Sequence, residues 1–163
     1  MTLGSAEPHP APVLVLGLGN LLLRDDGVGL ELLRRLEAEM PASDRVEFLD
    51  GGTQGIALLS FMAGRQALLI LDAVALGDSP GTVHAHEGPD FPQARPGITA
   101  HEGNAGELLA TAQLIGDLPE KIHLVGIEPD EIRTGIGLSP AVAEAVPRGV
   151  KAARRALEAL IEP

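Results

Sequence analysis

The stretch at residues 13–29, VLVLGLGNLLLRDDGVG, constrains the fold more than any other part of the sequence. It opens with a short apolar run bounded by glycine, which is typical of a central strand buried on both faces. Apolar residues then recur at helical spacing over residues 27–40, with charged residues between them, until Pro41 ends the pattern. A buried strand that passes through a glycine turn into an amphipathic helix indicates an α/β fold.

Apolar runs and helical patterns keep alternating to the end of the chain. Further strands are predicted at 46–49, 67–71, 82–87 and 122–127, and further helices at 54–64, at 99–115 and from 140 onward. In the first of these helices, Ile56, Leu59 and Phe61 are expected to face the core. The pattern predicts a three-layer α/β sandwich, with a mostly parallel, roughly five-stranded twisted sheet flanked by helices. Residues 12–163 are expected to form this single domain, preceded by a flexible leader at 1–11.

Composition excludes several classes of function. The net charge of −11 repels nucleic acid and anionic lipid, and only 2% of residues are aromatic, so bases have little to stack on. The chain has no cysteine, so a metal ion would need nitrogen and oxygen ligands. No apolar run approaches the roughly 20 residues of a membrane span, and the first residues do not resemble a signal peptide. We therefore expect a cytoplasmic protein, monomeric and without membrane insertion.

Polar residues follow three of the predicted strands, where ligands bind in open α/β sheets. Asp26 comes after the glycine turn of the first strand, Asp50 ends the second and Asp72 ends the third. His101 lies at the start of the helix predicted over 99–115, so it can reach the same edge. Carboxylates combined with one neutral imidazole suit a divalent first-row metal ion. The sequence therefore predicts a cation site at the carboxyl edge of the sheet.

A dinucleotide site is the main alternative for the opening motif, because a glycine turn after a first strand also begins that fingerprint. Here, however, Leu22 stands at the third glycine position. Asp25 and Asp26 would also face the pyrophosphate at a helix end that attracts anions. Negative charge at this point favours a cation over a phosphate.

Each candidate also has a structural interpretation. Asp25 is assigned as the N-cap of the first helix, the commonest role of aspartate at such a place. Asp50 precedes two glycines and fits turn chemistry as well as it fits a functional role. Nothing local explains Asp72, which favours function. His84 and His86 share one face of an exposed strand and are interpreted as solvated surface.

Five segments resemble those of the [NiFe]-hydrogenase maturation endopeptidases, in the order found in that family. They are GLGNLLLRDDGVG at 17–29, LDGGT at 49–53, LLILDAV at 68–74, ITAHEG at 98–103 and VGIEP at 125–129. The resemblance implies an endopeptidase that removes the C-terminal extension of the hydrogenase large-subunit precursor after nickel insertion. It also implies that Asp26, Asp72 and His101 recognise nickel supplied by the precursor. The first position is Glu in some members and Asp in others, so Asp26 is one methylene shorter than the Glu version.

The resemblance leaves the route of hydrolysis open. Nickel could act as a Lewis acid, or it could only position the peptide while a carboxylate, Asp26 or Asp50, activates water as an aspartic-type general base. Two other functions compete with the endopeptidase. One is a different hydrolase on a related scaffold, such as a peptidyl-tRNA hydrolase, and the other is a non-catalytic chaperone that binds nickel or the precursor.

Overall fold

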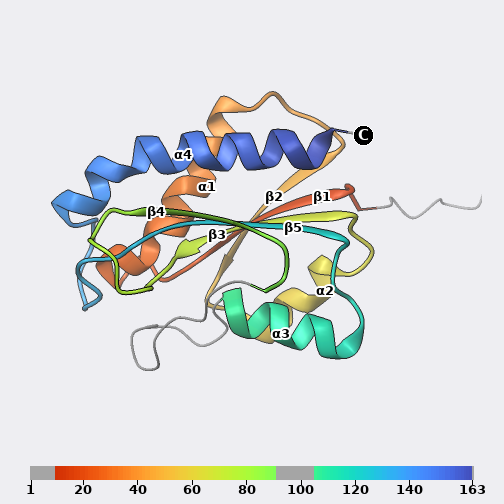
Figure 1. The fold of residues 1–163 in the computed structure, drawn as a ribbon, viewed down its shortest axis with the longest axis horizontal. Helices are drawn as coiled ribbons and strands as arrows, with labels where there is room; N and C mark the ends of the chain where they lie inside the picture. The colour runs from red at the N-terminus through yellow and green to blue at the C-terminus, as the bar shows by residue number, and fades with distance from the viewer. Residues whose placement is uncertain (1–9, 91–104, 163) are drawn as a thin grey trace, which may run out of the picture.

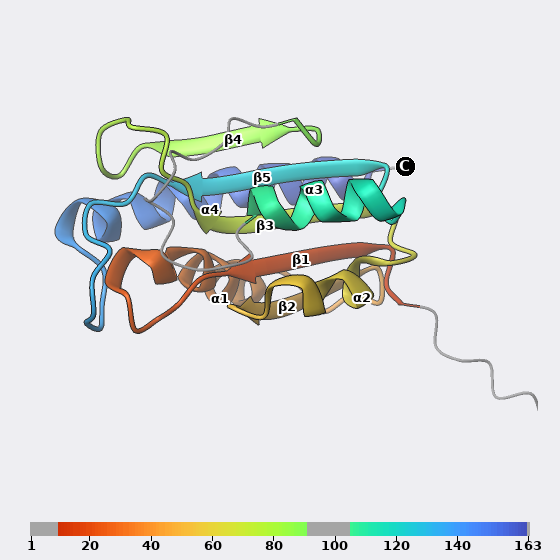
Figure 2. The same ribbon diagram turned by 90° about the horizontal axis from the view of Figure 1, so that it is seen from below.

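The fold is built on one five-stranded sheet, seen in a computed structural model that describes residues 10–90 and 105–162. The strands are β1 (Val13–Leu18), β2 (Val46–Gly52), β3 (Ala67–Ala73), β4 (Val83–Glu87) and β5 (Lys121–Ile127). Their order across the sheet is β2-β1-β3-β5-β4, which Figure 2 shows from one face. Four strands are mutually parallel, and β4 pairs antiparallel with β5 at one edge. The predicted sheet is therefore confirmed.

Helices cover both faces of the sheet and complete the three layers (Figure 1). The long helices α1 (Val28–Glu39) and α4 (Pro140–Ile161) pack on one face. On the other face lie α3 (Ala105–Ile115) and the short α2 (Leu59–Met62), which follows a 3-10 turn at Gly55–Leu58. Among the helices that the structure describes, none is long and apolar enough to cross a lipid bilayer.

The alternation of side chains along β1 divides the core in two. Val13 and Val15 pack with α1 and α4, whereas Leu14 and Leu16 pack with α2 and α3. All four side chains are buried because β1 is a central strand with a helical layer on each side. The continuous apolar run in the sequence has this physical origin.

The sheet has a topological switch point between β1 and β3. From β1 the chain crosses by α1 to β2 on one side, and it then returns by α2 to β3 on the other side of β1. Two connections that leave in opposite directions open a crevice at the carboxyl ends of the two strands. This edge is the one at which the sequence predicts the site.

One local prediction about the core was wrong. Ile56 is 64% exposed and Phe61 is 41% exposed, while the buried side chains of this segment are Leu58 and Met62. The reason is that residues 55–58 form a 3-10 turn and only 59–62 are α-helical, so the segment does not keep one helical period. Leu58 and Met62 lie four residues apart and point to the sheet together.

Gly29 sets how closely α1 approaches the sheet. A Cβ atom at Gly29 would lie 2.4 Å from the carbonyl oxygen of Leu71 and 2.5 Å from that of Leu18. Both atoms belong to backbone at the ends of β3 and β1, so neither can move aside cheaply. The first turn of α1 therefore rests directly on the crevice between these strands.

We expect Gly29→Ala to lower the free energy of unfolding by about 1–3 kcal/mol, because the added methyl overpacks this contact. Helix propensity alone predicts the opposite, a gain of about 1 kcal/mol. Urea denaturation measures the difference. Ala38→Gly, at an exposed position of the same helix, is the control and should cost about 1 kcal/mol. A Gly29→Ala variant as stable as the parent would contradict the contact.

Candidate active site

Asp26 lies in a tight turn between β1 and α1, within the 3-10 segment Arg24–Gly27. Its side chain is buried, and its Oδ2 accepts a hydrogen bond from the backbone N–H of Asn20 at 2.9 Å. Gly19 makes this turn possible, since it has φ +136° and a Cβ there would lie 2.1 Å from the Asp26 carbonyl oxygen. The glycine turn thus folds back onto Asp26 and fixes it at the carboxyl end of β1.

Asp72 lies at the neighbouring strand end, as the last residue but one of β3. It is 2% exposed, and its Oδ1 accepts a hydrogen bond from the N–H of Ala73 at 2.8 Å. Its Oδ2 accepts a longer bond, 3.4 Å, from the N–H of Ala105 in the first turn of α3. The Asp72 side chain thus connects the end of β3 to the first turn of α3.

The close approach of α1 brings Asp26 and Asp72 to the same crevice. A Cβ at Gly29, three residues after Asp26, would lie only 2.8 Å from the Cα of Asp72. The Arg24–Gly27 segment also packs against β3. Two buried carboxylates that line one crevice offer oxygen donors of the kind that bind divalent cations. A role of these two residues as metal contacts stays a prediction.

Asp50 is not brought to this pair. It is exposed, and its Oδ1 accepts a hydrogen bond from the N–H of Gly52 at 3.0 Å, which is turn chemistry. It pairs with Gly17, and a Cβ at Gly17 would meet Leu33 of α1. By strand alternation Asp50 therefore belongs to the α1 face of the sheet, and Asp72 to the α3 face. A catalytic role for Asp50 stays a prediction.

His101, the third predicted metal contact, lies outside the described residues. Ala105, the described residue that follows it most closely in the chain, is the one that donates to Asp72. Within residues 10–90 and 105–162, no three His, Asp or Glu side chains are grouped so that they could hold a metal ion. The described part of the predicted site is thus the carboxylate pair alone.

Asp25 has a structural role, but a different one from the predicted N-cap. The N-cap of α1 is Gly27, and no side chain caps that helix. The Asp25 carboxylate instead accepts hydrogen bonds from the N–H groups of Asp130, Glu131 and Ser139 and from the Ser139 hydroxyl, at 2.7–2.9 Å. Burial alone would raise the pKa of Asp25, but these bonds outweigh it and lower that pKa below its ordinary value. Ser139 directly precedes α4, and its hydroxyl binds Asp25 and does not cap the helix.

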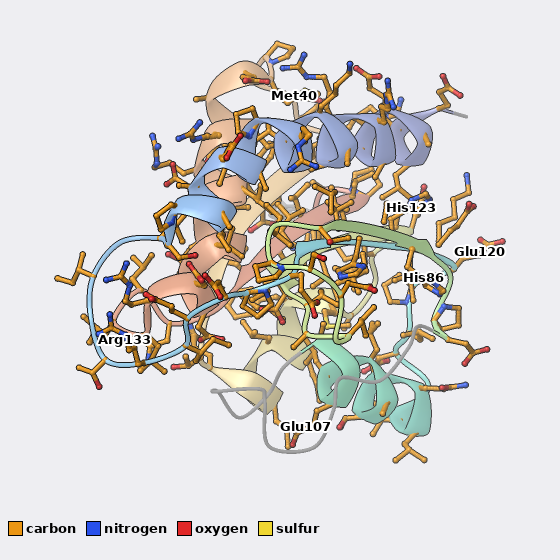
Figure 3. The ribbon with its side chains drawn as sticks, turned by 60° about the vertical axis from the view of Figure 1, so that its left-hand side comes forward. Met40, His86, Glu107, Glu120, His123 and Arg133 are labelled. Carbon is orange, nitrogen blue, oxygen red and sulfur yellow. The ribbon has the colours of Figure 1, made fainter. Side chains whose placement is uncertain are left out.

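The loop that Asp25 holds forms one side of the site. Backbone hydrogen bonds join Leu22 and Arg24 to Gly135, so residues 20–26 and 130–139 make one rigid rim. Figure 3 shows Arg133 at this end of the molecule, opposite the end that carries Glu120 and His123. Three large apolar side chains of the rim are exposed: Leu21 by 57%, Leu22 by 62% and Ile136 by 83%. Exposed apolar residues close together on loops mark a contact surface.

His84 is a residue whose environment the sequence interpretation missed. Its Nε2 lies 3.1 Å from Oε2 of Glu128, and only 14% of its side chain is exposed, so its assignment to solvated surface was wrong. Glu128 is 3% exposed and also accepts bonds from the N–H groups of Leu76 and Gly77. The partners are far apart in the chain, so no local spacing reveals the pair.

Known proteins resemble the chain over most of its length. The sequence profile of the hydrogenase maturation proteases matches residues 30–156. The chain belongs to this family. The hydrogenase expression/formation protein HupD of Rhodobacter capsulatus is 37% identical over 153 residues, which cover 92% of this chain and 73% of that protein. The hydrogenase 2 maturation protease of Escherichia coli K12 is 38% identical over 132 residues, 80% of each chain.

The fold agrees with solved members of the hydrogenase maturation protease family. The hydrogenase maturating endopeptidase HybD from E. coli has a TM-score of 0.78 and 33% identity, covering 90% of this chain and 92% of HybD. The family predicted from the five sequence segments is confirmed, and so is the α/β fold. The chain is a peptidase by family, and two of its buried carboxylates, Asp26 and Asp72, lie at the β1/β3 switch point of that fold.

We expect Asp25→Asn to lower the free energy of unfolding at pH 7 by about 2–3 kcal/mol, because an amide cannot accept all four hydrogen bonds. The pKa of Asp25 is lowered in the folded protein. Its stabilisation is therefore full above the ordinary carboxyl pKa, about 3.9, and fades as the pH falls below it. Urea denaturation from pH 7 to pH 3 should show the parent and the variant converging. Asp44→Asn, at an exposed site, is the control, and an equal loss there would refute this role.

Proposed function

We propose that this chain is the nickel-recognising endopeptidase that removes the C-terminal extension of a [NiFe]-hydrogenase large-subunit precursor. The buried pair of Asp26 and Asp72 at the β1/β3 switch point is the observation that carries the proposal. Membership of the hydrogenase maturation protease family supports the reaction class and the kind of substrate. The sequence motif around His101 supplies the imidazole that completes the donor set.

Nickel enters this scheme with the substrate. The chain has no cysteine, so it offers only oxygen and nitrogen donors, and these suit a metal ion that the precursor already holds. Contact with the carboxylate pair then favours a loaded precursor, because carboxylate oxygens bind a metal ion and a precursor without nickel offers them none. The nickel ion thereby signals that insertion is complete. Holding the ion also positions the adjacent peptide bond, which lowers the barrier by several kcal/mol.

The carboxylate that activates water is assigned to Asp26 in preference to Asp50. Asp26 lies in the crevice beside Asp72, whereas Asp50 is exposed and its Oδ1 accepts the hydrogen bond of its own turn. A general base must lie within hydrogen-bond reach of the water that attacks the peptide bond. In the proposed scheme the peptide bond is held at the carboxylate pair, which favours Asp26 for this role.

We expect Asp26→Asn, Asp72→Asn and His101→Ala each to slow cleavage of nickel-loaded precursor by at least about 100-fold. Each change removes a proposed contact to the ion or the base. Asp50→Asn should slow cleavage far less. The measurement is the intact mass of the large subunit over time, with nickel-free precursor as the substrate control and circular dichroism to verify folding.

The same experiment tests the alternatives. Wild-type rates in all three variants would overturn the assigned site. Binding of the precursor by the wild-type chain without any change in its mass would show a chaperone instead of a protease. Cleavage of nickel-free precursor at the same rate would remove nickel recognition from the proposal.

The exposed apolar rim supports docking of a protein substrate beside the carboxylate pair. We expect Leu22→Asp to weaken binding of nickel-loaded precursor by at least about 10-fold, because it places a charge in a desolvated contact. Leu114→Asp, at an 87% exposed site on α3, is the matched control and should bind as the parent does. Surface plasmon resonance with immobilised precursor measures both. Equal affinities would exclude the rim from the docking surface.

A further inference from the structure

A cavity of about 290 Å³ lies on the α3 side of the sheet, between β4 and the chain that follows β3. Five of its seven lining residues are apolar, Val74, Leu76, Val83, Ala85 and Leu124, and the other two are His84 and His86. For scale, a cavity of about 150 Å³ takes up a benzene molecule. The cavity can therefore hold one aromatic or two small aliphatic side chains.

The strand register places this cavity beside the carboxylate pair. Asp72 pairs with Gly126 on β5, and Gly126 pairs with His84 on β4, so the three lie in one row across the sheet. Paired residues share a face, so Asp72 and His84 project to the same side. Gly126 contributes no side chain between them, and Val74 lies over it, as a Cβ at Gly126 would be 2.3 Å from Cγ2 of Val74. Two strand spacings put the Cα atoms of Asp72 and His84 about 10 Å apart.

Buried hydrogen bonds to Glu128 hold the walls of the cavity in place. Glu128 accepts bonds from the N–H groups of Leu76 and Gly77 at 2.8 Å and 2.6 Å, and its Oε2 lies 3.1 Å from Nε2 of His84. One carboxylate, 3% exposed, thus joins the segment after β3 to the edge strand β4. Bonds to a buried charge are stronger than neutral ones, so the cavity is preformed instead of shaped by its ligand.

We propose that this cavity is a specificity subsite, which receives an apolar side chain of the precursor within three residues of the cleaved bond. The inference rests on the proposed function, because the peptide is positioned by the ion at Asp72. An extended peptide advances about 3.4 Å per residue, so three residues span the distance of about 10 Å from Asp72 to His84. The five apolar lining residues favour an apolar side chain, and an acidic one there loses its hydration beside the buried Glu128 carboxyl group, which already binds His84.

His84 and Leu76 are the residues that determine this specificity. Both line the cavity, and both are fixed by Glu128, His84 through its imidazole and Leu76 through its backbone N–H. Neither reacts with the peptide. They set the width of the cavity, and the loss of a few carbon atoms from such a wall changes substrate preference about 10- to 200-fold.

Leu76→Ala tests the subsite, because it widens the cavity and keeps the backbone bond to Glu128. The substrates are nickel-loaded precursors in which each of the three residues on either side of the cut is changed, one at a time, to Val, Phe or Asp. At one position we expect the wild-type chain to disfavour Asp by at least about 10-fold in kcat/KM. At that same position Leu76→Ala should raise the ratio of kcat/KM for Phe over Val by about 10-fold.

Two further variants keep the test decisive. His86→Ala widens the same cavity from the edge strand and should shift the ratio in the same direction, so a folding defect in one variant does not end the test. Leu114→Ala, on an exposed part of α3, should leave the ratio unchanged. A ratio of kcat/KM that stays unchanged in both cavity variants overturns the subsite. This holds also if both variants have a lower melting temperature, because that result means that another part of the chain fills the cavity. If wild-type protein fails to cleave any loaded precursor, the proposed function fails, and that outcome is distinct from cleavage without preference.

Discussion

The first turn of α1 lies in van der Waals contact with the ends of β1 and β3, and the rest of the site depends on that contact. It exists because positions 19 and 29 carry no side chain at points where a Cβ would meet backbone atoms. Asp26 precedes this turn, and Asp72 ends the strand beneath it. A glycine pattern that resembles a phosphate-binding turn therefore serves here to bring two carboxylates together. The switch point between β1 and β3 determines where they meet.

The adjacent carboxylates of Asp25 and Asp26 have different roles because their surroundings differ. Asp25 is surrounded by donors and uses its charge to fasten the 130–139 loop. Asp26, the next residue, lies at the crevice, where it accepts a hydrogen bond from the backbone N–H of Asn20. The first carboxylate holds a loop in place, and the second lies at the crevice that Asp72 also lines, the edge at which ligands bind in such sheets. Asp25 thus stabilises the loop beside the site, and its neighbour Asp26 belongs to the site itself.

Prediction from the sequence succeeded where the signal was periodic and failed where it depended on distant partners. The apolar run of β1 and the α1 pattern both specify their own structure locally. The inward residues of 55–62 were misassigned because a 3-10 turn and an α-turn are not distinguished by spacing alone. The role of Asp25 was misassigned because its partners lie more than one hundred residues away. His84 was assigned to the surface because its strand was expected to be exposed. In the structure its side chain is mostly buried and lies against Glu128.

The sequence by itself determined the sheet, the layers, the family and the identity of the carboxylates at the strand ends. It could do so because hydrophobic periodicity and short motifs are local, and because carboxyl ends of parallel strands must share an edge. Only the tertiary structure decided which of those residues meet. Strand register and face assign Asp72 to one side of the sheet and Asp50 to the other, and the packing of α1 brings Asp26 to Asp72. The cavity beside His84 is likewise a product of pairing between β4 and β5, a contact that no single segment of the chain encodes.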